Sequence, residues 1–140
     1  MNTYLLCLNI LLIGIIIYLL FHSSNVHHVY GTIAKTPKQK ERGLMFRKHP
    51  LQMNEGMLFD MGYKINSLWM KNTYIPLDIL FLSKDMKVIG YIEDTEPLSL
   101  KTLKIDKPST YVIEMNGNSV SLLNIRIGDK ILFHKKLKLS

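Results

Sequence analysis

The sequence predicts a mainly β, α+β domain behind an N-terminal membrane helix: a compact, curled antiparallel sheet, barrel-like or sandwich-like, with one or two short helices. Three observations lead to this prediction. A long apolar run lies near the N-terminus, a capped helix start follows near residue 36, and six short apolar runs then alternate with turn residues. The 140 residues give room for one such domain and not for several.

The first element is the apolar segment from Tyr4 to Phe21, interrupted only by an asparagine and a glycine. A helix of this length would rise about 27 Å, close to the ~30 Å hydrocarbon core of a bilayer. No Lys, Arg, Asp or Glu precedes Lys35, so the segment lacks the basic start of a cleaved signal peptide. We therefore expect residues 1–25 to be a transmembrane anchor, with a signal segment as the alternative.

The remaining residues, 26–140, are expected to form one globular domain. Thr36, Pro37 and Gln39 have the pattern of an N-cap, a first helical proline and a capping-box partner, which predicts a helix over 37–46. Further along, short runs rich in β-branched and aromatic residues have the length of strands. These predicted strands cover residues 56–59, 67–70, 77–82, 88–92, 111–115 and 130–133.

Turn residues separate these predicted strands. Residues 83–86 have the composition of a hairpin turn, and residues 116–118 break the chain again. One helical turn capped by Asn118 is expected over 119–124. The polar stretch 93–109 contains two prolines and is expected to be a loop.

The composition excludes several kinds of site. The single cysteine, Cys7, lies in the apolar segment, so neither a disulfide framework nor a cysteine enzyme is expected. Adjacent His27 and His28 would point to opposite faces of a strand, which makes a poor metal site. No serine elbow or glycine-rich phosphate loop occurs, and the lysines behind the net charge of +7 are scattered among acids. We therefore expect no metal, no cofactor and no nucleic-acid partner.

One segment collects side chains that could bind a ligand. Trp69, Lys71, Asn72, Thr73 and Asp78 lie within ten residues, near a strand end broken by a proline. In a functional interpretation, Trp69 supplies apolar area and Lys71 meets an anionic group. In a structural interpretation, Trp69 is core, Asn72 and Thr73 form a turn, and Lys71 pairs with Asp78.

Strand alternation offers one way to choose between these interpretations. In a strand, Leu68 and Met70 share one face, while Trp69 and Lys71 share the other. If the first pair enters the core, Trp69 stands on the far face, where a ligand, a loop or a partner should cover it.

Several motifs occur in an order that resembles one known family. They are Arg42-Gly43-Leu44-Met45-Phe46-Arg47, Gly56-Met57-Leu58-Phe59, Trp69-Met70-Lys71-Asn72-Thr73, Ile75-Pro76-Leu77-Asp78-Ile79, Tyr111-Val112-Ile113-Glu114 and Ile127-Gly128-Asp129. Together they resemble the uncharacterised family called domain of unknown function 192 (DUF 192) over residues 28–134; Leu68 stands where that family typically has phenylalanine. The resemblance implies a small, mainly β domain, common in exported or membrane-anchored bacterial and archaeal proteins. It implies no established reaction, cofactor or catalytic residue.

These observations together predict a membrane-anchored, non-catalytic module that binds a small-molecule or protein partner beside a lipid bilayer. The candidate binding residues are Arg42, Trp69, Lys71, Asn72, Thr73, Asp78 and Glu114. The alternatives are a structural accessory of a membrane complex, or a small enzyme using Lys71 and Asp78 as acid and base. Lysines after the apolar segment favour a cytoplasmic domain. The habit of the resembled family favours an extracytoplasmic one, which is the expectation here.

Overall fold

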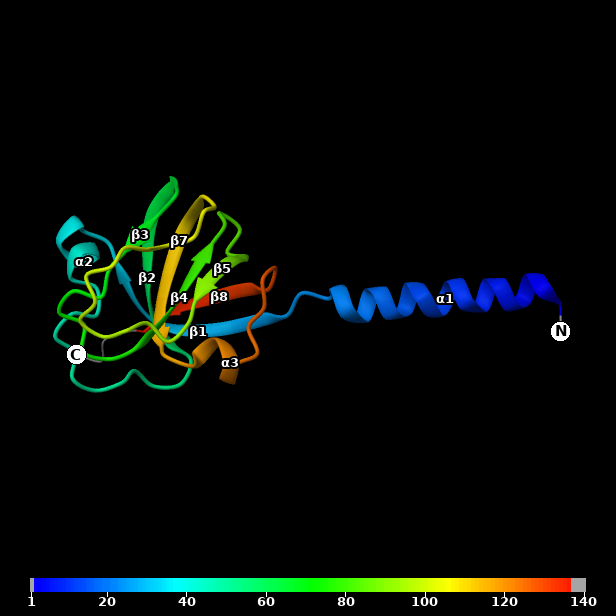
Figure 1. Cartoon of the computed structure of the whole chain (residues 1–140), viewed down its shortest axis with the longest axis horizontal. Coiled ribbons are helices and arrows are strands. Elements are labelled where there is room, and N and C mark those ends of the chain that lie inside the picture. Colours follow the sequence, from blue (N-terminus) through cyan, green and yellow to red (C-terminus); the bar gives the residue numbers. More distant parts are fainter. Residues whose placement is uncertain (1, 137–140) are drawn as a thin grey trace.

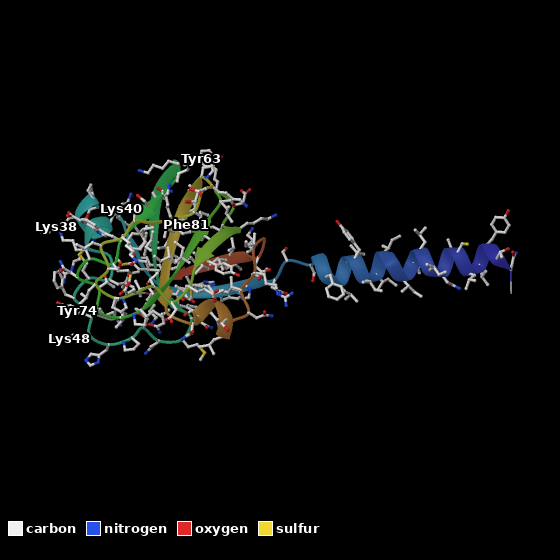
Figure 2. All side chains as sticks on the ribbon, in the orientation of Figure 1. Lys38, Lys40, Lys48, Tyr63, Tyr74 and Phe81 are labelled. Carbon is white, nitrogen blue, oxygen red and sulfur yellow. The ribbon has the colours of Figure 1, made fainter. Side chains whose placement is uncertain are left out.

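The computed structural model describes residues 2–136 (Figures 1 and 2). The last four residues of the predicted domain, 137–140, lie outside this range. Helix α1 (Thr3–His22) extends away from a β domain formed by the rest of the described chain (Figure 1). The stretch Thr3–Phe21 is unburied, and it is long and apolar enough to be a membrane span or a signal sequence.

In the described part of the chain, the β domain contains eight strands and two short helices. In chain order they are β1 (Val26–Ala34), α2 (Pro37–Arg42), β2 (Glu55–Lys64), β3 (Ser67–Leu68), β4 (Leu77–Leu82), β5 (Val88–Ile92), β6 (Leu103–Lys104), β7 (Ser109–Asn116), α3 (Ser119–Leu122) and β8 (Lys130–Lys135). Six strands form one sheet in the order β5-β4-β7-β2-β1-β8, and β3 pairs with β6 in a separate ribbon. Strand β6 lies in the stretch predicted to be a loop.

The main sheet curls until its two edge strands meet at one end. The Val88 N–H of β5 donates to the Asp129 carbonyl at 2.8 Å, and the Ile131 N–H of β8 donates to the Met86 carbonyl at 2.9 Å. The curled, mainly β sheet predicted from the sequence is therefore confirmed. The sequence did not predict β1, which pairs in parallel with both β2 and β8, so the sheet is mixed and not wholly antiparallel.

Helix α2 begins as predicted and ends early. The Thr36 hydroxyl accepts from the Gln39 N–H at 3.2 Å, and the Gln39 side chain accepts from the Thr36 N–H at 3.0 Å, which completes the capping box. The predicted helix over 37–46 is too long, because the chain leaves the helix at Gly43. The φ of 45° and ψ of −126° there form a backbone conformation that residues with a Cβ avoid.

Strand alternation gives the main sheet two buried faces. One face carries a core that includes Leu58, Leu80, Ile113 and Met115, and Val120 of α3 belongs to the same core. The opposite face, packed against the β3–β6 ribbon, carries Phe59, Ile79, Phe81 and Val112. We call the second of these the ribbon face. Because Glu114 alternates with Ile113 and Met115 along β7, its side chain belongs to the ribbon face.

Candidate functional site

A pocket of about 430 Å³ lies on the ribbon face beside α2. Helix α2 lies at the end of the β domain away from α1 (Figure 1). We call this pocket the Glu114 pocket. Its inner part is apolar and includes Leu44 and Phe59, both buried. Its mouth carries Lys40, Arg42 and Lys64 together with Trp69. Figure 2 shows Lys38, Lys40, Lys48 and Tyr74 at this same end of the domain.

Among the described residues, Glu114 contributes the one carboxyl group in the inner part of this pocket. It sits on the central strand β7, with Met57 of β2 and Ile79 of β4 as its neighbours across the sheet. Glu114 is 6% exposed, and its Oε2 atom has no hydrogen-bond partner within residues 2–136. A Cβ at Gly43 would lie 3.1 Å from this oxygen, so a glycine is what allows the backbone to pass so close to the carboxyl.

Burial dominates the electrostatics of this carboxyl. Desolvation raises the pKa of Glu114 from 4.5 to about 7, although a hydrogen bond from the Leu44 backbone N–H lowers it. The other ionisable side chains lining the pocket are Lys40, Glu41 and Arg42 from α2 and Lys64 from β2. Near neutral pH both forms of the carboxyl are therefore populated. The protonated form can donate a hydrogen bond, and the ionised form can accept one.

Trp69 stands at the mouth of the pocket directly after β3, which ends at Leu68 and so is shorter than the predicted strand over 67–70; Leu68 lines the same pocket. Trp69 is 44% exposed, while the neighbouring Met70 is 1% exposed and packs in the core. The Lys71 ammonium lies 4.9 Å from the centroid of the Trp69 ring, close enough for a cation–π interaction. A neighbouring depression of about 400 Å³ is lined by Arg42, Trp69, Lys71 and Asn72 among others.

The structure brings together most of the predicted binding residues. Arg42, Trp69, Thr73 and Glu114 line the Glu114 pocket, and Lys71 and Asn72 line the neighbouring depression. The predicted turn is also present. Asn72 has a φ of 53°, and the Thr73 hydroxyl donates to the Lys71 carbonyl at 3.2 Å.

Asp78 lies apart from this group. Its buried carboxylate accepts the backbone N–H groups of Asp94 at 2.8 Å, Asn118 at 3.1 Å and Val120 at 2.8 Å. It thereby caps α3, whose own N-cap Asn118 makes no side-chain cap. The predicted pairing of Lys71 with Asp78 is wrong, because Lys71 lies on the Trp69 ring.

Strand register explains the separation of the two acids. Asp78 faces Met115 across the β4–β7 pair, and cross-strand partners share one face of a sheet. Met115 follows Glu114 directly, so the two carboxyl groups point to opposite faces. Asp78 therefore cannot contribute to the pocket.

The adjacent histidines point to opposite faces of β1, as predicted. His27 Nε2 lies 2.8 Å from Asp129 Oδ2, and His28 Nδ1 lies 2.8 Å from His134 Nε2. Burial would raise the pKa of Asp129, but hydrogen bonds from His27 and from two backbone N–H groups bring it below its usual value. Within residues 2–136, no group of three His, Cys, Asp or Glu side chains is placed to hold a metal ion.

Sequence reasoning missed several residues of the pocket, namely Lys40, Gly43, Phe59 and Lys64. These residues come from α2, the turn that follows it and β2, which meet only in the folded chain. One usable signal was present. A lone glutamate lies in the otherwise apolar run 111–115, on a strand with two buried faces. Glutamate is rarely buried at such a position unless its carboxyl is paired.

The chain matches one family model. The model of the family DUF192, described as an uncharacterized ACR, matches residues 20–133, and the chain belongs to this family. This confirms the resemblance found in the motifs.

Two solved structures are similar to this chain. A candidate transcription regulator from Sinorhizobium meliloti 1021 is 35% identical, with a TM-score of 0.65 over 75% of this chain and 78% of that one. A protein of unknown function from Novosphingobium aromaticivorans DSM 12444 is 36% identical, with a TM-score of 0.67 over 71% of each chain. No curated protein matches the chain.

Proposed function

We propose that the chain is a membrane-anchored, non-catalytic binding module that holds a small ligand in the Glu114 pocket. The observation that carries this proposal is the unpartnered Oε2 of a buried glutamate lining an open pocket. A buried polar atom without a partner costs about 1–3 kcal/mol. A ligand that supplies the missing hydrogen bond would recover this energy.

The surroundings of the carboxyl support recognition. Apolar side chains line the inner pocket, and Trp69 at the mouth offers a large, half-exposed ring. A concave, mainly apolar site with a few convergent polar groups is the usual form of a small-molecule site. Catalysis by Lys71 and Asp78 lacks support, because Asp78 is held by three backbone N–H groups on the other face of the sheet.

The position of the pocket supports a ligand that arrives through water. Strand β1 begins just after α1 and leads toward α2, and its nine residues span roughly 30 Å at ~3.3 Å each. Helix α2, which lines the pocket, lies at the end of the β domain away from α1 (Figure 1). If α1 crosses a bilayer, the pocket therefore lies at the end of the domain away from the membrane. We place the domain on the extracytoplasmic side, in line with the export habit that the family resemblance implies.

A fragment screen by saturation-transfer NMR tests the proposal, with the full-length chain in nonionic detergent micelles. We expect small polar fragments to bind the wild type and to lose binding in the Glu114→Gln variant. The matched control is Glu96→Gln, which makes the same chemical change at an exposed position outside the pocket. Fragments that bind all three proteins equally, or no binding to any of them, would contradict a ligand site at Glu114.

A further inference from the structure

The Glu114 pocket is chemically polarised from its inner end to its mouth. At the inner end, the Glu114 carboxyl is 6% exposed and has one oxygen without a partner. Around it lie Leu44 and Phe59, which offer no counter-charge. When the carboxyl is ionised, a ligand atom that enters this end must donate a hydrogen bond or carry positive charge.

The mouth has the opposite character. Lys40, Arg42 and Lys64 line it, against one exposed carboxylate, that of Glu41. The neighbouring depression shares Arg42 and Glu41 and adds Lys38 and Lys71. Lysine and arginine side chains at such a mouth favour a carboxylate or phosphate.

We propose that the pocket binds a short organic zwitterion, with a protonated amine against Glu114 and an anionic group among the cations of the mouth. This rests on the proposed function and names its ligand class. The apolar side chains between the two ends suit a methylene chain joining the two groups. A charged amine is preferred over a hydroxyl because a hydrogen bond between charged partners is roughly twice as strong as a neutral one.

The binding should depend on the charge of Glu114. Burial raises the pKa of this carboxyl to about 7, so the amine must compete with a proton. Amine affinity should therefore rise from about pH 6 to about pH 8 and then level off. Lys40, Glu41, Arg42 and Lys64 are the other ionisable groups lining the pocket. The titration of these groups and of the ligand anion also affects the affinity. This effect is the same for amine and hydroxyl ligands that share one anion, so comparing the two ligands removes it.

The experiment measures the affinity of matched probes for the full-length chain in nonionic micelles, by calorimetry. The probes are ω-amino acids from aminobutyrate to aminooctanoate, each with its ω-hydroxy analogue and its unsubstituted fatty acid. At about pH 8, we expect the best amino acid to bind at least about tenfold more tightly than its hydroxy analogue. Glu114→Gln should remove this preference and its pH dependence, whereas the control Glu96→Gln should retain both.

The outcomes separate this inference from the proposed function. Equal affinity of amino and hydroxy probes, or an amine preference that survives in Glu114→Gln, overturns the zwitterion proposal. If the hydroxy probes bind as tightly as the amino probes and lose binding in Glu114→Gln, the proposed binding function is supported, and the zwitterion is the wrong ligand class. If no probe binds, the zwitterion proposal fails, and the fragment screen then decides whether the pocket binds anything.

Discussion

Replacing Glu114 with glutamine should make the domain more stable at high pH and leave it nearly unchanged at low pH. In the folded chain the pKa of this carboxyl is about 7, against an ordinary value of 4.5, because burial disfavours the charged form. The folded state therefore holds one more proton than the unfolded state between these two pH values. The resulting stability is fully present below about pH 4.5 and is lost as the pH rises through about 7. The difference between the folded-state pKa and the ordinary pKa corresponds to about 3 kcal/mol of unfolding free energy.

The assay is urea unfolding of the wild type and the Glu114→Gln variant from about pH 4.5 to pH 8. Emission from Trp69, the only tryptophan, follows the β domain even with α1 in detergent micelles. We expect the unfolding free energy of the glutamine variant to exceed that of the wild type by about 3 kcal/mol at about pH 8, and to match it near pH 4.5. Glu96→Gln, at an exposed position, is the control and should follow the wild type. A constant difference between wild type and Glu114→Gln at every pH would refute a raised pKa at this buried carboxyl.

Other expectations concern the anchor, the capping acid and the tryptophan. A fragment starting at Val26 should unfold cooperatively without detergent, because the apolar stretch Thr3–Phe21 is unburied; a gradual thermal transition would make α1 part of the fold. Asp78→Asn should lower the unfolding free energy by about 2–4 kcal/mol, since three backbone N–H groups lose a charged acceptor. Lys71→Met should lower it by less than about 1 kcal/mol, and the two effects should add in a double-mutant cycle; coupling beyond about 0.5 kcal/mol would contradict their separation. Iodide should partly quench Trp69 emission, since this residue is 44% exposed, and a bound ligand should reduce the quenching; blue-shifted emission that iodide leaves untouched would place the ring in the core.

Local interactions account for what the sequence alone determined. The apolar length of Tyr4 to Phe21 marks a possible span, and the pattern at Thr36 and Gln39 specifies a capped helix through contacts within one turn. Strands β4 and β5 match their predicted bounds, because their apolar composition and the turn between them are local properties.

Non-local pairing decided the remainder. Strand β1 contains two histidines and a glycine, and it becomes a strand because β2 and β8 flank it on both sides. The β4–β7 register sends Asp78 and Glu114 to opposite faces, and no spacing along the chain reveals which acid lines a pocket and which caps a helix. The Glu114 pocket exists only because the turn after α2 brings Gly43 against a strand some seventy residues away in sequence. Sequence periodicity determined which side chains alternate, whereas the tertiary fold alone determined what each of them faces.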